Sequence, residues 1–575
     1  MRLVTLLPLS LLCSPALADV LGPRYPYPTD ISSNSSRVLH SWRDLTAALD
    51  AQLAPNSTSE LRNVTFSVGI FSLHDPNAAF NPAVQYHYTA PEVANSQYGI
   101  RRVNGDAVYR LASITKLITM YAGLLSLDSA DWERPLTDFF PQLAEGSTSA
   151  GIAQSVQWDK ITVMTLASHL GGVPRDAFGA SENDIALVAK DPTALGLPPL
   201  SPDDPQARAV CNVLEDAACV FELDNYIAGL APRPPTFLPW TSPGYSNNAY
   251  ILLGQIFQSI TGKEMEELYR DSIFGPLGMS TTTSVVPPES FFPHCVIPGD
   301  DLVSFASDLP ILRSSGGVLS TLHDLSKMGM AILNNTLLSR EETSRWMKPH
   351  THTDRFQVSI GAPWEIFRHQ DAATGIVVDM YCKSGDSGVA STWTCLLPDF
   401  EVGFNVLGAS TSANRTALIG EVADGVVDAI VPSLLHQAAL ETQARFAGVY
   451  ESTVEGLNSS LTLAVNTTYG APPGMTIVSF ISNSTSVTEL VSPRLVPSIA
   501  SPRTNQQAFR SINAVDIPSR QLGRLSDLSL LGWVSPGVVT YGNLDIDLFV
   551  FELDPAGRAT AVNLPGFRAS LVRVG

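Results

Sequence analysis

A serine and a lysine lie three residues apart in a strongly apolar segment of this sequence. Ser113 and Lys116 belong to the stretch Tyr109–Met120, and residues three apart share one face of a helix. The apolar residues around them predict a buried helix. Burial lowers the pKa of a lysine, so its neutral amine can act as a base. A serine at the N-terminal end of that helix would have its developing anion stabilised by free backbone N–H groups. The pair therefore predicts a serine nucleophile activated by a lysine.

Two further motifs follow in the chain. Tyr-Ser-Asn at residues 245–247 directly precedes a helical run that ends at Gly262, and Lys-Ser-Gly at 383–385 ends a strand-like stretch that begins at Gly375. A single Ser-x-x-Lys is expected about once by chance in a chain of this composition. All three motifs in this order and context indicate a functional site.

The N-terminus predicts export. Residues 1–18 combine one basic residue, a short apolar core and a small-x-small sequence ending at Ala18, which is typical of a signal peptide. After these residues the sequence contains no run of about 20 apolar residues, so no membrane-spanning helix is predicted. The formal charge of −20 argues against nucleic acid or an anionic membrane surface as a partner. We expect a secreted, extracellular protein.

Cysteines and glycosylation sequons agree with an oxidising compartment. Cys382 and Cys395 would face each other if the chain between them forms a hairpin that turns near Gly388. The other cysteines outside the signal are Cys211 and Cys219, which could close a small loop, and Cys295, which would remain a free thiol. Eight Asn-x-Ser/Thr sequons, suggestive of glycosylation, begin at Asn34, Asn56, Asn63, Asn334, Asn414, Asn458, Asn466 and Asn483.

The chain is long enough for more than one domain. After the signal, we expect an N-terminal extension at 19–60, a catalytic domain at 61–438 and an all-β C-terminal domain at 439–575. The Pro-rich segment 173–242 is predicted to be loop-like and to roof the site. Predicted helices are Val38–Leu53, Ile161–His169, 248–261, 264–273 and Ala413–Gln443, the last with a possible break at Pro432. Predicted strands are Thr65–Leu73, then 375–384, 389–397 and 401–408 as antiparallel hairpins, and, in the C-terminal domain, 446–450, 460–465, 475–480 and 548–553.

The three motifs resemble those of the serine β-lactamase and penicillin-binding-protein superfamily, in particular its class C β-lactamase, D-aminopeptidase and esterase branch. The resemblance extends over roughly residues 65–430, and the C-terminal β-domain is similar to that of secreted fungal β-lactamase-related proteins. It implies an α+β fold, with an antiparallel sheet flanked by helices and a helical lobe. Accessory stretches similar to the family framework are Ser168–Gly172, Gly275–Met279, Gly316–Thr321 and Leu397–Gly403.

The resemblance implies a role for each motif residue. Ser113 would be acylated, with Lys116 as its base partner and Tyr245 sharing or relaying the proton. Asn247 would bind a substrate amide or hold Lys116 in place. Lys383 would direct its charge at Tyr245 or at a substrate carboxylate. The expected contributors to substrate binding and the oxyanion hole are Ser384, Gly385 and Asp386, the last through its backbone N–H together with that of Ser113.

Some positions leave alternatives open. Asp386 would repel carboxylate-bearing substrates if its side chain pointed into the site. Ser246 could be only a turn residue, and His169 fits packing or capping better than acid or base chemistry. His350, His352 and Asp354 superficially resemble a metal-binding pattern, but Arg355 stands where its last histidine would be. Neither a metal nor a cofactor is expected.

The resemblance and the motifs together predict a serine hydrolase that acts through an acyl-enzyme on a small ester, amide or peptide. Esters or D-amino-acid amides are favoured over β-lactams. An alcohol or amine acceptor would make the same site an acyltransferase. A site that acylates without turnover would make the protein a ligand-binding one, and a third alternative is a core that only presents the β-domain. The sequence does not indicate an oligomeric state.

Overall fold

The computed structural model divides into two compact units, and each is described separately. The larger unit comprises Asp44–His369 and Asp379–Val426, and the smaller one comprises Met1–Arg43, Gln370–Val378 and Val427–Gly575. The division falls inside helix α15 (Arg415–Phe446). The structure describes residues 23–75, 77–145, 151–176, 185, 189, 191–201, 223–306, 310–471, 473–501, 505–512 and 536–574.

An eight-stranded sheet forms the centre of the larger unit, in the order β2-β1-β10-β9-β8-β7-β6-β5. The hairpins predicted between residues 375 and 408 are confirmed: β9 pairs antiparallel with both β8 and β10. The strand predicted at Thr65–Leu73 is β1. The strands are β1 (Thr65–Ser72), β2 (Gln85–Tyr88), β5 (Thr351–His352), β6 (Val358–Ile360), β7 (Glu365–Gln370), β8 (Val377–Ser387), β9 (Ala390–Leu397) and β10 (Val402–Ala409).

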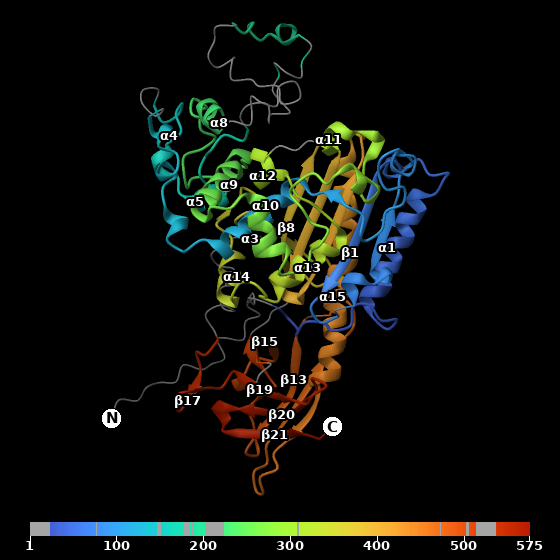
Figure 1. Cartoon of the computed structure of the whole chain (residues 1–575). Coiled ribbons are helices and arrows are strands. Elements are labelled where there is room, and N and C mark those ends of the chain that lie inside the picture. Colours follow the sequence, from blue (N-terminus) through green and yellow to red (C-terminus); the bar gives the residue numbers. More distant parts are fainter. Residues whose placement is uncertain are drawn as a thin grey trace. The chain divides into compact units, whose positions relative to one another are not determined.

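Different helices pack on the two faces of this sheet (Figure 1). On one face, α13 (Leu322–Leu333) packs so closely on β1 that a side chain at Gly69 would lie 3.0 Å from Leu322. On the other face, a side chain at Gly408 of β10 would lie 2.3 Å from Ile419 of α15. Alternate side chains of a strand point to opposite faces, so α13 covers one face of the sheet and α15 covers the other. The predicted helix at Val38–Leu53 is α1 (Arg37–Leu53).

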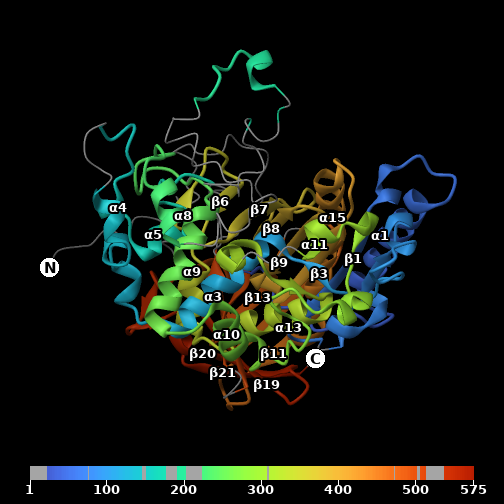
Figure 2. The same cartoon turned by 45° about the horizontal axis from the view of Figure 1, so that its top comes forward.

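Most of the remaining helices gather on one side of the sheet, opposite α1 (Figures 1 and 2). They share one apolar core, in which the ring of Trp132 packs edge-on against Phe257 of α9. Helix α9 ends at Gly262, whose φ of +69° gives the left-handed cap that glycine favours. The helices of this lobe include α3 (Thr115–Ser126), α4 (Pro141–Glu145), α5 (Val163–Ala167), α8 (Leu223–Leu230), α9 (Asn247–Thr261), α10 (Met265–Tyr269) and α12 (Arg313–Gly316).

One prediction about helices is wrong in part, and one alternative that the sequence left open is decided. The segment 173–242 is not entirely loop, because α8 forms within it and buries Tyr226 and Ile227 in the core. Helix α15 continues through Pro432 without a break. The neighbouring Ser433 donates its hydroxyl to the carbonyl groups of Ala429 and Ile430, at 2.8 and 2.9 Å, and so bonds to the turn that precedes the proline. In the part of the chain that the structure describes, no helix is both long and apolar enough to cross a bilayer.

The smaller unit contains a closed antiparallel barrel. This confirms the prediction of an all-β C-terminal region. Its strands follow the order β12-β11-β21-β20-β19-β16-β15-β13, and β13 pairs with β12 to close the circle. Phe446, Phe509 and Phe551 pack against one another inside, with ring centroids 5.1–5.4 Å apart. The strands are β11 (Gly448–Glu451), β12 (Ser460–Val465), β13 (Met475–Ser482), β15 (Arg494–Ser501), β16 (Gln506–Ile512), β19 (Leu548–Leu553), β20 (Ala559–Leu564) and β21 (Ala569–Arg573).

Candidate active site

A short strand and a sharp turn present Ser113 at the start of α3. The strand β3 (Tyr109–Arg110) pairs with β4 (Leu319–Ser320). The chain then turns at Ala112, whose φ of +48° lies in the left-handed region. A residue with a Cβ pays about 1–2 kcal/mol for that conformation. Ser113 follows in the 3-10 turn that leads directly into α3, so the predicted placement at a helix N-terminus is confirmed.

Three motif residues meet at the serine hydroxyl. Lys116 Nζ lies 3.0 Å from Ser113 Oγ, and the Tyr245 hydroxyl lies 2.7 Å from the same oxygen. Lys116 is fully buried and donates a second hydrogen bond, of 2.7 Å, to the carbonyl of Ser315 in α12. The predicted sharing of one helix face by Ser113 and Lys116 is therefore confirmed. Both candidate proton acceptors lie within hydrogen-bond distance of the nucleophile.

Three cations surround the ring of Tyr245. Lys116 Nζ lies 5.1 Å, Lys383 Nζ 5.3 Å and the Arg175 guanidinium carbon 5.1 Å from the ring centroid. Cations within about 6 Å of an aromatic face are attracted to its electron density. The structure thus brings the third motif to the second: Lys383, on β8 of the sheet, approaches Tyr245, which directly precedes α9 of the helical lobe.

Burial and mutual charge shift the pKa values of these groups. Burial lowers the pKa of Lys116, and the nearby Lys383 lowers it further, although Tyr245 partly opposes both effects. Burial alone would raise the pKa of Tyr245, but the charges of Lys116 and Lys383 outweigh it, so the pKa lies below its usual value. A weakly basic lysine beside an acidic phenol can exchange a proton at moderate pH. This pair is suited to take the proton of Ser113.

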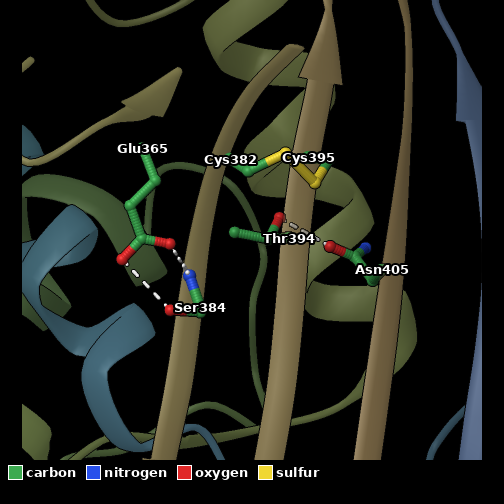
Figure 3. The surroundings of a disulfide bond; sticks show 6 residues. All are labelled: Glu365, Cys382, Ser384, Thr394, Cys395 and Asn405. Atoms are coloured by element: carbon green, nitrogen blue, oxygen red, sulfur yellow. Dashed lines mark hydrogen bonds between the residues drawn. A yellow bond between two sulfur atoms is a disulfide. The ribbon is translucent and has the colours of Figure 1, made fainter. Parts of the chain in front are cut away.

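A carboxylate that the sequence analysis missed holds the third motif. Glu365, on the neighbouring strand β7, forms a close ion pair with Lys383. It also accepts hydrogen bonds from the Ser384 N–H at 2.8 Å and from the Ser384 hydroxyl at 3.0 Å (Figure 3). Burial disfavours the charged form of Lys383, but Glu365 and Tyr245 outweigh this effect, so its pKa is raised. Lys383 therefore keeps its positive charge at neutral pH.

Gly385 allows the sheet to approach the nucleophile closely. A Cβ at this position would lie 2.2 Å from the Leu111 carbonyl oxygen and 3.1 Å from the backbone nitrogen of Ser113. Thr392 of β9 donates its hydroxyl to the same Leu111 carbonyl at 2.9 Å. Strands β8 and β9 thus fix the backbone on which Ser113 is mounted. The oxyanion role of the Ser113 and Asp386 N–H groups stays a prediction.

Two predicted binding residues have partners away from the serine hydroxyl. The Asn247 side chain donates to Asp176 at 2.7 Å, whereas the described partners of Lys116 are Ser113 and Ser315. The Asp386 carboxylate accepts hydrogen bonds from Arg415 at 2.7 Å and from Thr416. Arg415 and Thr416 belong to α15, so this carboxylate is already engaged by a cation and gives no support for repulsion of substrate carboxylates.

The ambiguous residues take local structural positions. Ser246 caps α9: its hydroxyl accepts from the Ala249 N–H at 3.0 Å and donates to the Pro174 carbonyl at 2.9 Å. His169 is buried in the turn after α5, beside Tyr245. His352 contacts Ser359 through Nδ1. Among the described residues, no group of three or more histidine, cysteine or acidic side chains is arranged to hold a metal ion.

One predicted disulfide lies next to the site. Cys382 and Cys395 are bonded across β8 and β9, directly beside Lys383 in sequence (Figure 3). The hairpin turns at Gly388, as predicted, with φ at +55°. Cys295 is a buried free thiol, as expected. Cys211 and Cys219 lie outside the described residues.

A physical signal for Glu365 was available in the sequence. A lysine in an apolar strand requires a counter-ion, so Lys383 implied an acidic partner on a neighbouring strand. The sequence did not indicate which carboxylate that would be. Arg175 and Asp176 belong to none of the three motifs, and only the folded chain brings them to Tyr245 and Asn247.

Comparison with known proteins assigns the family. A family model described as Beta-lactamase matches residues 84–425, and one described as Beta-lactamase-like-like, C-terminal domain, matches residues 438–575. The chain belongs to the beta-lactamase family. This confirms the resemblance and the fold class inferred from the three motifs. The boundary predicted between residues 438 and 439 stays a prediction, because the compact units divide at a different position.

Relatives of this family member include a "Beta-lactamase-like protein" of Arthroderma benhamiae, 24% identical, with 96% of this chain and 95% of that protein covered. A "Probable hydrolase clz13" of Cochliobolus lunatus is also 24% identical, over 84% and 82%. The "D-alanyl-D-alanine-carboxypeptidase/endopeptidase AmpH" of Escherichia coli K12 is 22% identical, over 56% and 76%. A class C beta-lactamase structure from Rhodobacter sphaeroides aligns with a TM-score of 0.45 at 15% identity, over 68% and 98%. Hydrolases among these relatives support the serine-hydrolase class predicted from sequence.

Gly385→Ala tests the close approach of the sheet in this beta-lactamase-family protein. The added methyl group would overlap the Leu111 carbonyl and displace the backbone of Ser113. We expect kcat/KM for hydrolysis of a short p-nitrophenyl ester to fall by about 100-fold, the loss typical of a misplacement of about 1 Å. Gly420→Ala is the control, because Gly420 lies in α15 with open space around it, and it should leave activity unchanged. Activity of Gly385→Ala within threefold of the wild type would contradict the prediction.

Glu365→Gln tests the ion pair. An unpaired buried Lys383 should lower the free energy of unfolding at pH 7 by about 3 kcal/mol. The folded-state pKa of Lys383 is raised in the wild type, so its stabilising effect is present below the ordinary lysine pKa and is lost as pH rises through the folded value. The deficit of the variant, measured by denaturant unfolding, should therefore shrink at strongly alkaline pH.

Asp379→Asn provides the matched control for that measurement. It removes the carboxylate of an ion pair with Arg368 in which both side chains are more than 40% exposed. Exposed pairs contribute about 0–1 kcal/mol. Equal losses in the free energy of unfolding for Glu365→Gln and Asp379→Asn would contradict the prediction that the Lys383–Glu365 pair stabilises the fold more than an exposed pair does.

Proposed function

We propose that this protein is a secreted serine hydrolase that cleaves small esters or amides through an acyl-enzyme on Ser113. The observation that carries the proposal is the convergence of Lys116 and Tyr245 on one serine hydroxyl, at 3.0 and 2.7 Å. A hydroxyl with two adjacent proton acceptors and shifted pKa values is the arrangement of an activated nucleophile. A structural serine has no need for two titratable partners, one buried and one half-buried.

The proposed reaction has two halves. Ser113 Oγ forms a bond to the substrate carbonyl carbon while its proton passes to the Lys116–Tyr245 pair. Backbone N–H groups of Ser113 and Asp386 stabilise the resulting oxyanion. The bond to the leaving alcohol or amine then breaks, and that group takes up the proton. Water attacks the acyl-Ser113 ester in the second half and gives a proton to the same pair. The bond between the acyl carbon and Ser113 Oγ then breaks, Oγ takes up that proton, and the acid leaves.

The constant charge of Lys383 supports the acidity of Tyr245 throughout this cycle. Glu365 keeps Lys383 protonated, and Lys383 lowers the pKa of Tyr245. A phenol with a lowered pKa is a better acceptor partner at neutral pH than an ordinary tyrosine, whose pKa is about 10. The activity should therefore not require strongly alkaline conditions.

The substrate class rests on relatives and on chemistry. The AmpH relative is named a carboxypeptidase and endopeptidase, and others are named hydrolases. These names support ester or peptide-type amide substrates for this family member. One fold can support different acyl groups and acceptors, so a screen of acyl donors is the natural next step.

Hydrolysis of a short p-nitrophenyl ester by the purified protein, alongside Ser113→Ala, tests the proposal. We expect Ser113→Ala to lower kcat by about 10³-fold or more, as loss of a nucleophile does in other serine hydrolases. Ser35→Ala, a change at an exposed serine, is the control. Equal rates for Ser113→Ala and the wild type would contradict the proposed nucleophile. A single burst without turnover would instead indicate ligand capture.

The exposure of the predicted glycosylation sites supports secretion. All eight sequon asparagines are exposed. Expression of the full chain in a fungal host should yield protein in the medium, beginning after Ala18, with a mass that decreases on treatment with an N-glycosidase. Retention inside the cells with an intact residue 1–18 segment would contradict this part of the proposal.

A further inference from the structure

His169 is a buried histidine that the proposed reaction does not use. Its side chain is 5% exposed, and its backbone has a φ of +59°. Its Nε2 atom has no hydrogen-bond partner among the described residues. A buried N–H without a partner costs about 1–3 kcal/mol. A residue that carries this cost and a left-handed backbone beside a nucleophile requires an explanation.

His169 contacts the Tyr245 segment at three points. Its carbonyl oxygen accepts a hydrogen bond from the Gly244 N–H at 2.9 Å. Its Nδ1 accepts one from the Ser246 N–H at 3.2 Å. The imidazole ring lies against the Tyr245 ring itself, with centroids 4.8 Å apart. The backbone N–H groups of the residues before and after Tyr245, and the ring between them, are therefore held by one residue.

The Nδ1 contact requires a neutral imidazole. Because Nδ1 accepts a hydrogen bond, the ring proton is assigned to Nε2. Burial lowers the pKa of His169 well below its usual range, and the charges of Lys116, Lys383 and Arg175 lower it further. The ring consequently stays neutral and keeps its acceptor at working pH. It is poorly suited to act as an acid, because its Nε2 proton has no described acceptor.

We propose that His169 is a positioning residue that holds the Tyr245 hydroxyl on Ser113. This inference rests on the proposed function, since it assigns a role to Tyr245 in proton transfer. The left-handed backbone of His169 directs both its carbonyl and its ring toward the Tyr245 segment. Three contacts on one short segment restrict the ring to the position in which its hydroxyl lies 2.7 Å from Ser113 Oγ.

Displacement of Tyr245 should change the rate and its pH dependence together. A ring that moves away from Lys116 and Lys383 loses the charges that lower its pKa. Its pKa then rises, and the acidic limb of the rate profile moves to higher pH because the basic form is needed. The charged and titratable groups around the ring are Lys116 on α3, Lys383 on β8, Arg175 and Asp176 in the loop after α5, Tyr250 on α9, and Glu365 on β7 behind Lys383.

Two variants separate the contacts of His169. His169→Phe keeps an aromatic ring but removes the acceptor of the Ser246 N–H. His169→Asn removes the ring but keeps a side-chain acceptor, and asparagine tolerates the left-handed backbone. Trp158→Phe is the control: Trp158 is fully buried with an unpartnered Nε1, and none of its described contacts reaches Tyr245. All three variants alter a buried aromatic site, so general loss of packing should affect them alike.

The measurement is the pH dependence of kcat and KM for a p-nitrophenyl ester, on full-length protein shown to be folded by its melting curve. We expect His169→Phe to lower kcat by about 10- to 100-fold, to leave KM within about threefold, and to move the acidic limb to higher pH. His169→Asn should show a smaller loss of kcat with the same direction of shift, and it carries the test alone if His169→Phe does not fold. Trp158→Phe should leave the position of the limb unchanged.

An acidic limb in the same position for both His169 variants and the wild type would overturn the inference. So would losses of kcat no larger than that of Trp158→Phe. Failure of the proposed function gives a different result, because Ser113→Ala would then retain wild-type hydrolysis. Ser113-dependent hydrolysis with unshifted His169 variants would overturn only the positioning role.

Discussion

Two lysine ammonium groups buried around one tyrosine ring set the conditions for the rest of this site. Neither cation can be buried without compensation, since removal from water costs several kcal/mol per ion. Lys383 is compensated by Glu365 on the adjacent strand, and Lys116 by a carbonyl of α12 and the oxygen of Ser113. These partners come from the sheet and from the helical lobe. Assembly of the larger unit is therefore a precondition for the chemistry.

The local part of this arrangement could be predicted from the sequence. The i to i+3 spacing of Ser113 and Lys116 fixes their common face on a helix. The turn near Gly388 fixes the facing positions of Cys382 and Cys395 in the hairpin. Such features depend on the period of one element or on the register of one turn. These features therefore do not depend on how the rest of the chain folds.

Non-local partners could not be predicted in the same way. Glu365 meets Lys383 because β7 lies beside β8 in the sheet, and sequence distance does not specify strand order. Helix α8 was missed because the prolines around it dominate the composition of its segment, although burial of Tyr226 stabilises it. Pro432 was weighed as a possible break, yet α15 continues through it. In each case tertiary packing outweighed a local signal.

Backbone strain lies next to the chemistry. Ala112 and His169 both have positive φ values without being glycine. Ala112 directly precedes Ser113, and His169 contacts Tyr245, whose hydroxyl meets Ser113 Oγ. Gly385 shows the complementary case, in which absence of a side chain lets the sheet approach. Strained residues persist where the surrounding structure over-determines them. Here hydrogen bonds from Val318 to Thr115 and from Thr392 to Leu111 hold the nucleophile segment in place.

The closed C-terminal barrel has a consequence for association. Because β12 bonds to both β11 and β13, eight strands close into a ring, and among the described residues only the two-residue strand β14 (Thr485–Ser486) is added to it, along β13. Open sheet edges are where separate chains add strands to one another and where aggregation begins. Closure of the barrel thus leaves few open strand edges in the described part of this domain, which would suit the secretion proposed for the protein.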